Sequence, residues 1–202
     1  MAEWDGYILT DYRFEFLPGS VILDVGCGSG HQLSELQNTE ANAFGVDIDQ
    51  DSLNVCRERG LNIAAGEAER LPYQDEAFDG ILCKVVLSYT DDRKAVAEIA
   101  RTLRPGATAY IVTHGAGYYL TYFLKNRSLA TRFYGLRSLV NTMFFSLTGK
   151  RLPGFLGDTI YQSERLLSQL YTANGLELTS TSSSKGPFGY PVFIYHKIIR
   201  KR

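Results

Sequence analysis

Apolar and polar positions follow two different periods along the first half of the chain. Short, nearly continuous apolar runs predict buried strands near 21–25, 43–46, 62–65, 78–83 and 108–113. Between them, apolar positions recur every three or four residues near 31–37, 51–59 and 92–103, which predicts amphipathic helices. Strands that alternate with helices form a parallel sheet covered on both faces, so the pattern predicts a doubly wound α/β fold.

The end of the chain follows another pattern. The apolar positions Leu166, Leu167, Leu170 and Tyr171 predict a helix that ends before Gly175. Two strands, near 176–182 and 192–199, then follow with no helix between them. Consecutive strands without a crossover helix pair antiparallel, so the sheet should end in an antiparallel pair.

Segment 115–157 differs in composition from its surroundings. It contains no Asp or Glu, and its apolar and aromatic positions recur at helical spacing. Its charged residues are Lys125, Arg127, Arg132, Arg137, Lys150 and Arg151. We expect two amphipathic helices here, with Gly135 as a possible break between them.

Composition favours one globular domain over residues 1–202, since 45% apolar and 21% charged residues are ordinary values. The net charge of −1 argues against a surface designed for nucleic acid. The start of the chain is acidic, no long apolar span is visible, and the three cysteines form neither a disulfide framework nor a zinc motif. We therefore expect a reduced, cytoplasmic protein without a metal; its oligomeric state is left open.

The first predicted strand runs directly into a turn rich in glycine, with Gly26, Gly28 and Gly30 at alternate positions after Asp24. Glycines allow positive φ and close approach of a ligand, and the helix that follows offers unpaired N–H groups. A dinucleotide fingerprint needs its third glycine at position 31, which is His31. A carboxylate at Asp24 also suits a cationic group better than a phosphate.

A second acidic residue stands about twenty residues after the glycine turn. Asp47 ends the second predicted strand, where a doubly wound fold places the carboxylate that binds a ribose diol. The apolar residue Ile48 follows it and could lie against adenine.

These motifs resemble motif I and its neighbours in the class I S-adenosylmethionine-dependent methyltransferases. The stretches Gly66–Pro72, Phe78–Cys83 and Leu103–Gly106 are similar to those of the ubiquinone/menaquinone-biosynthesis-like (methyltransferase type 11) group, the last as a turn before strand five. The resemblance implies a seven-stranded Rossmann-like sheet with an antiparallel last strand and a helical insertion after strand five. It also implies S-adenosyl-L-methionine as cofactor.

The resemblance assigns the cofactor contacts residue by residue. The methionyl part would lie against the glycine turn, the ribose on Asp47, and the adenine beside Ile48, Glu67 and the backbone of Ala68, with Glu67 in place of the usual Asp. The residues expected to border the cofactor are therefore Asp24, Gly26, Cys27, Gly28, Gly30, Asp47, Ile48, Glu67, Ala68 and Cys83. Cys27 and Cys83 would serve there as small apolar side chains rather than as nucleophiles.

Methyl transfer from a sulfonium needs mainly alignment, so a strong catalytic motif is not required. His114 ends the fifth predicted strand and is the candidate general base; a purely local structural role is the alternative. Motifs for methylation of base amines and of cytosine C5 are absent. The sequence therefore favours O- or C-methylation of a small, apolar or ring-containing metabolite.

Several alternatives remain open at this stage. Segment 115–157 is interpreted as a substrate cap, as core packing, or as a peripheral surface for a membrane or a partner. The rival function is a cofactor-binding but non-catalytic partner subunit that uses this segment for interaction. A nicotinamide-dependent oxidoreductase is a third possibility. The N-terminal residues Trp4, Tyr7, Tyr12 and Arg13 could complete the pocket, with an aromatic ring or the arginine meeting the cofactor carboxylate; ordinary packing of an N-terminal helix is the alternative.

Overall fold

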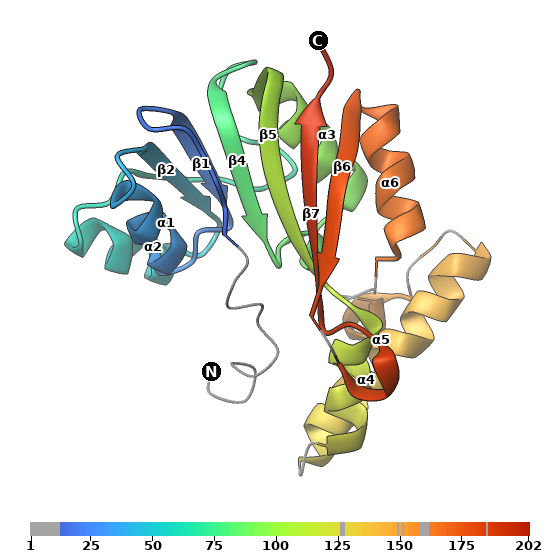
Figure 1. Ribbon diagram of the computed structural model, residues 1–202. Helices are drawn as coiled ribbons and strands as arrows, with labels where there is room; N and C mark the ends of the chain where they lie inside the picture. Colours follow the sequence, from blue (N-terminus) through green and yellow to red (C-terminus); the bar gives the residue numbers. More distant parts are fainter. Residues whose placement is uncertain (1–12, 126–127, 149, 151, 158–161, 185) are drawn as a thin grey trace.

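The computed structural model describes residues 13–125, 128–148, 150, 152–157, 162–184 and 186–202 (Figure 1). The expectation for Trp4, Tyr7 and Tyr12 lies outside these residues, whereas Arg13, named with them, is described and exposed. The elements follow one another as β1 (Val21–Val25), α1 (His31–Gln37), β2 (Asn42–Asp47), α2 (Gln50–Glu58), β3 (Ile63–Ala65), β4 (Phe78–Lys84), η2 (Leu87–Tyr89), α3 (Asp92–Thr102), β5 (Leu103–His114), α4 (Ala116–Lys125), α5 (Leu129–Thr148), η3 (Gly154–Gly157), α6 (Glu164–Ala173), β6 (Leu176–Ser183), η4 (Pro187–Gly189) and β7 (Phe193–Arg200).

The strands form one seven-stranded sheet in the order β3-β2-β1-β4-β5-β7-β6. The first five pair in parallel, and β7 runs antiparallel to both β5 and β6. The predicted fold class is therefore confirmed. One expectation is corrected: Leu103–Gly106 is not a turn before β5 but its first part, because Leu103 already pairs with Phe78 and the register shifts before Gly80.

Alternate residues of β1 face two different layers of the molecule. Leu23 and Val25 belong to a core shared with α3 and α6, whereas Ile22 packs with Leu33 and Leu36 of α1. On the α1 side, no helix of the described residues lies over part of the sheet (Figure 1). The rings of Phe14 and Phe16 cover Tyr110 of β5 there, so the segment before β1 completes this layer.

Side chains fix where three of the helices begin. The N-cap residues of α2, α3 and α6 are Asp49, Asp91 and Ser163, and each has extended backbone. Their side chains accept hydrogen bonds from the backbone N–H groups of Ser52, Lys94 and Leu166, respectively. These caps place the N-terminal ends of α2 and α3 at the carboxyl edge of the sheet, where the predicted site lies.

The insertion between β5 and α6 contains two helices, as expected, and they project from the carboxyl edge of the sheet (Figure 1). Gly135 does not break them; it lies inside α5. A Cβ atom there would stand 2.6 Å from the Tyr119 carbonyl oxygen and 2.9 Å from the Phe123 nitrogen of α4. Glycine therefore lets the two helix backbones approach. None of the helices in the described part of the chain is long and apolar enough to cross a membrane.

Candidate active site

A pocket of about 530 Å³ opens at the carboxyl edge of the sheet, within the usual range for small-molecule sites. It is bounded by the ends of β1, β2 and β4 and by the segments that follow β3 and β4. The residues that line it are Val25, Gly26, Val46, Asp47, Ile48, Gly66, Glu67, Ala68, Glu69, Lys84, Val85, Val86, Tyr89 and Thr90. Five residues of the predicted set are among them, namely Gly26, Asp47, Ile48, Glu67 and Ala68, whereas Asp24, Cys27, Gly28, Gly30 and Cys83 do not line this pocket.

Two glycines of the turn fit where a larger residue could not. Gly26 has φ +71°, and a Cβ atom on it would lie 2.2 Å from Cγ2 of Val86. Gly30 has φ +79°, and its Cβ atom would lie 2.3 Å from Cδ1 of Leu61. Gly28 differs, because its φ is +51° but nothing lies within 4 Å of the position of its Cβ atom. Gly28 therefore leaves open space at the tip of the turn, where a ligand can approach the backbone.

Asp47 connects the glycine turn to the end of β2. Its Oδ2 accepts a hydrogen bond from the Gly28 N–H at 2.7 Å, and its Oδ1 accepts one from the Asp49 N–H at 2.9 Å. An ionised carboxylate has about four acceptor sites, so each oxygen can accept a further hydrogen bond. The geometry thus suits a carboxylate that receives two neighbouring hydroxyl groups.

The adenine side of the predicted site consists of β2's end and the segment after β3. Ile48 lines the pocket with 68% of its surface exposed, which makes it an apolar surface available to a ring. Glu67 is exposed, and Ala68 is 9% exposed and packs into the core. Gly66 donates its N–H to the Asp47 carbonyl at 3.0 Å, so this segment is held beside the ribose position.

Asp24 is 2% exposed, and its Oδ2 has no hydrogen-bond partner among the described residues. Burial raises the pKa of Asp24 to about 7, although the nearby Lys84 cation opposes the rise. A buried carboxyl group with an unused oxygen is costly unless something compensates it. A ligand ammonium group would supply that compensation. The unused oxygen, the open turn at Gly28 and the pocket volume together fit the expected cofactor.

Cys27 and Cys83, which were expected to border the cofactor, do not reach the surface of the pocket. Cys27 is 7% exposed and Cys83 is fully buried in the main core, and neither lines the pocket. Burial raises the pKa of Cys83 to about 12, so it remains a thiol. Both act as small apolar side chains, Cys27 at the turn and Cys83 behind the pocket wall. The structure does not bring the side chain of Cys83 to the pocket.

Lys84, the last residue of β4, and the segment after it line the pocket, and the sequence did not predict them as part of the site. Lys84 donates from Nζ to Oε1 of Gln32 at 3.2 Å. Val85 has φ +63°, which is rare for a β-branched residue and marks a strained backbone beside the pocket. The position of Lys84 at the carboxyl end of a predicted strand could have indicated a site residue from the sequence. Nothing in the sequence predicts the positive φ of Val85.

His114 does not reach the pocket. It is 3% exposed, its ring stacks on that of Tyr118 with centroids 3.6 Å apart, and its Nδ1 lacks a hydrogen-bond partner in the described part of the chain. Burial lowers the pKa of His114 to about 3, so the ring is neutral at pH 7. Tyr89, whose ring centroid is 6.3 Å away, lines the pocket instead. The role of general base stays a prediction that this geometry does not support.

Tyr89 links the pocket to the helical insertion. Its hydroxyl group interacts with the hydroxyl groups of Tyr118 and Tyr134, and Tyr118 is 3.3 Å from the hydroxyl of Tyr122. Burial raises the pKa of both Tyr89 and Tyr118, so these groups stay protonated. Aromatic side chains of α4 and α5 thus contact a wall of the pocket. No cluster of metal-ligating side chains is found among the described residues.

Comparisons with known proteins agree with the motif assignment. Residues 23–111 match the family model described as a methyltransferase domain. A phthiotriol/phenolphthiotriol dimycocerosates methyltransferase of Mycobacterium tuberculosis is 38% identical over 97 residues, which cover 45% of this chain and 36% of that protein. A fatty-acid O-methyltransferase of Mycolicibacterium smegmatis is 41% identical over 96 residues, 44% of this chain and 35% of that protein.

A third relative has a different kind of substrate in its name. The tRNA (carboxymethyluridine(34)-5-O)-methyltransferase of Arabidopsis thaliana is 36% identical over 107 residues, 50% of this chain and 26% of that protein. The matched segment thus covers only about a quarter to a third of these relatives' lengths. The expectation that nucleic acid is excluded stays a prediction.

Solved structures resemble the whole fold. A SAM-dependent methyltransferase of Methanosarcina mazei superposes with a TM-score of 0.66 at 22% identity, covering 92% of this chain and 94% of that chain. Phosphoethanolamine N-methyltransferase 2 of Haemonchus contortus, solved with S-adenosyl-L-methionine, gives a TM-score of 0.67 at 13% identity, covering 93% of this chain and 50% of that chain. At these identities the similarity shows the fold.

Proposed function

We propose that this chain, whose residues 23–111 belong to the class I S-adenosylmethionine-dependent methyltransferases of the type 11 group, methylates an oxygen or carbon atom of a small apolar acceptor. The observation that carries the proposal is the combination of residues that line one pocket. Gly26, Asp47 and Ile48, which belong to the expected cofactor site, line it together with Val85, Val86 and Tyr89. A donor bound on the expected residues would share the pocket with apolar and aromatic side chains.

On the donor side, each predicted contact has a physical role. The two oxygens of Asp47, already fixed by backbone N–H groups, would accept the ribose hydroxyls without rearranging. Ile48 would cover one face of adenine, and Asp24 would receive the ammonium group through its unused oxygen. When bound, S-adenosyl-L-methionine supplies a methyl carbon that is already activated for displacement.

On the acceptor side, the chain provides alignment and exclusion of water. Tyr89 is held by Tyr118 and Tyr134, so the acceptor would meet a fixed aromatic surface rather than a mobile side chain. Two relatives are named for methylating a lipid or a fatty acid, which supports an apolar acceptor with a hydroxyl or carboxyl group. His114 would support this wall through its stack on Tyr118.

The test measures binding and transfer separately. Calorimetry with S-adenosylhomocysteine should show binding at one site. Labelled methyl groups from S-adenosylmethionine should then appear on long-chain fatty acids or on an apolar metabolite extract, and not on tRNA. Transfer to tRNA alone would overturn the acceptor class, and binding without transfer to any of these would favour the non-catalytic partner subunit.

Substitution of Tyr89 offers a sharper test of whether the aromatic part of the pocket binds the acceptor. Tyr89→Ala should lower kcat/KM for the acceptor by about tenfold or more, because it removes a large apolar contact from the wall. The affinity for S-adenosylhomocysteine should change by less than about threefold. Tyr190→Ala is the matched control, since Tyr190 is 53% exposed, Tyr89 is 52% exposed, and Tyr190 does not line the pocket. Equal effects of the two substitutions on kcat/KM would contradict the assignment of Tyr89.

A further inference from the structure

The buried face of helix α5 is unusually polar for a surface helix. It buries Gly135, Arg137, Ser138 and Asn141, whose side chains are small or polar, while Tyr134 and Leu139 pack only partly buried against the core. Arg137 lies over the Tyr134 ring at 5.2 Å, and Oδ1 of Asn141 accepts a hydrogen bond from the Leu152 N–H at 2.9 Å. An ordinary amphipathic helix would bury mainly apolar residues on this face and expose mainly polar ones on the other.

The outer face of α5 is apolar and continuous. It consists of residues spaced alternately four and three apart, which places them in one stripe along the helix: Leu129, Phe133, Leu136, Val140, Met143 and Leu147. Each is at least 42% exposed, and Leu129 and Leu147 reach 79%. The stripe is about 27 Å long at 1.5 Å per residue. A monomeric protein rarely exposes an apolar surface of this extent without a function.

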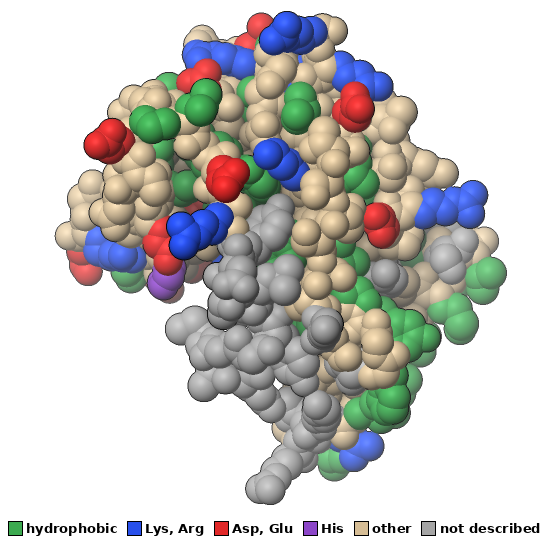
Figure 2. All heavy atoms as spheres, viewed as in Figure 1, with side chains coloured by type: hydrophobic (Ala, Val, Ile, Leu, Met, Phe, Trp, Pro, Cys, Tyr) green, Lys and Arg blue, Asp and Glu red, His purple; other side chains and the backbone are tan. Residues whose placement is uncertain are grey.

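The surface around the stripe carries no negative side chain of the insertion, because all 22 acidic residues lie outside 115–157. Arg132 and Lys150, near the two ends of α5, are exposed. Figure 2 shows hydrophobic side chains gathered at the lower right of the molecule, over the insertion, where acidic side chains are absent from view. Apolar surface flanked by basic residues alone is typical of helices that lie on anionic membranes.

Charge also decides between a membrane and a second copy of this chain. Helix pairs with a stripe at this spacing usually carry acidic and basic residues in matching flanking positions. Two copies of this insertion would bring only positive charges together, which disfavours self-association. An anionic phospholipid surface complements both the charge and the apolar stripe.

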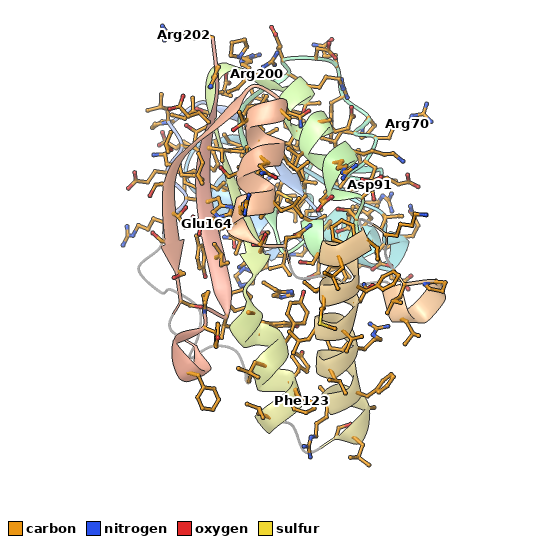
Figure 3. The ribbon with its side chains drawn as sticks, turned by 90° about the vertical axis from the view of Figure 1, so that its right-hand side faces the viewer. Arg70, Asp91, Phe123, Glu164, Arg200 and Arg202 are labelled. Atoms are coloured by element: carbon orange, nitrogen blue, oxygen red, sulfur yellow. The ribbon has the colours of Figure 1, made fainter. Side chains whose placement is uncertain are left out.

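We infer that the outer face of α5 lies in the plane of an anionic membrane, with the stripe immersed among the lipid headgroups and upper acyl chains. Helices α4 and α5 lie side by side, with Phe123 near the end of the pair that is distant from the sheet (Figure 3). The inner face of α5 carries Tyr134, which contacts the pocket wall through Tyr89. The membrane surface and the pocket are thus connected by one helix. The inference does not require that the proposed methyl transfer occurs.

The experiment is co-sedimentation of the full chain with vesicles. Vesicles of equal parts phosphatidylglycerol and phosphatidylcholine should retain the protein at about 50 mM salt and release most of it at about 500 mM. Vesicles of phosphatidylcholine alone should retain at least about tenfold less. Retention that does not depend on lipid charge overturns the proposal.

Matched variants locate the contact. The double variant Met143→Gln/Leu147→Gln should lower the partition coefficient on anionic vesicles by about tenfold or more. The control Leu17→Gln/Val55→Gln changes side chains of similar exposure outside the insertion and should leave partition unchanged. Unaltered affinity for S-adenosylhomocysteine, or an unaltered urea unfolding curve if that ligand does not bind, shows that the variants are folded.

Two results would reject the membrane proposal. One is equal partition of the two double variants and the parent. The other is a dimer, seen in analytical ultracentrifugation, that Met143→Gln/Leu147→Gln converts to a monomer, since the stripe would then be an interface between copies.

The single variant Lys150→Glu should bind anionic vesicles about tenfold more weakly than the parent, because it reverses one charge beside the stripe.

Discussion

At the residue scale, Asp47 has two roles that a single substitution affects together. Its carboxylate fixes the glycine turn through the Gly28 N–H and holds the backbone of Asp49 at the start of α2. The same oxygens are the proposed acceptors for the ribose hydroxyls. Local order and cofactor binding therefore depend on the same charged group.

Asp47→Ala should weaken binding of S-adenosylhomocysteine by about a hundredfold or more, because the two hydrogen bonds from the ribose hydroxyls to a charged group contribute about 1.5–3 kcal/mol each. Isothermal titration calorimetry measures this change. Asp51→Ala is the control, since Asp51 is an exposed residue in the first turn of α2 and does not line the pocket. A parent-like affinity for Asp47→Ala would refute the ribose assignment.

The sequence was informative about residues whose role follows from local chemistry. Gly26 and Gly30 have positive φ, as the glycine spacing of the turn indicated, but the sequence did not indicate that they pack against Val86 and Leu61. It was less informative about Asp24 and His114, because their pKa values depend on burial by residues distant in sequence. Tyr89 was missed for the same reason, since its place at the pocket depends on η2 and the insertion.

At the element scale, the α4–α5 pair depends on a close crossing at Gly135. In an isolated helix, Gly→Ala stabilises by about 1 kcal/mol. Here the added Cβ atom would stand 2.6 Å from the Tyr119 carbonyl oxygen, which forces the helices apart. Packing and intrinsic helix propensity therefore oppose each other at this position.

Gly135→Ala should lower the free energy of unfolding by about 1–3 kcal/mol, as overpacked cores do, despite the gain in helix propensity. Urea unfolding followed by circular dichroism measures it. Thr131→Ala, earlier in α5 and half-buried, is the control and should be neutral or slightly stabilising. A more stable Gly135→Ala protein would show that the crossing is not tight.

At the scale of the whole molecule, the buried Asp24 couples stability to pH. Its folded pKa of about 7 lies above the usual value of 3.8, so the unfolded chain releases this proton first as pH rises. Below pH 3.8, Asp24 is protonated in both states and makes the free energy of unfolding independent of pH. As pH rises from 3.8 to about 7, the free energy of unfolding falls progressively, because only the folded state still holds the proton. Above that pH, the folded protein without cofactor retains a buried negative charge that Lys84 compensates only in part.

Asp24→Asn should therefore gain stability relative to the parent by about 2–3 kcal/mol more at pH 8 than at pH 5, while binding S-adenosylhomocysteine more weakly. Urea unfolding at the two pH values measures the difference. Asp79→Asn should show no such change between these pH values, because burial alone would raise the pKa of Asp79 but the Val21 N–H and Arg104 together hold it below the usual value. A constant offset for Asp24→Asn would contradict the raised pKa.

The sequence by itself determined the alternation of strands and helices, the antiparallel end of the sheet and the glycine turn, because these depend on local periodicity and on backbone freedom. Tertiary structure decided which residues meet. It removed His114 and Cys83 from the pocket, added Lys84, Val85 and Tyr89, and turned the apolar face of α5 outward. Periodicity shows that a helix has two faces, but only long-range packing decides which of them is buried.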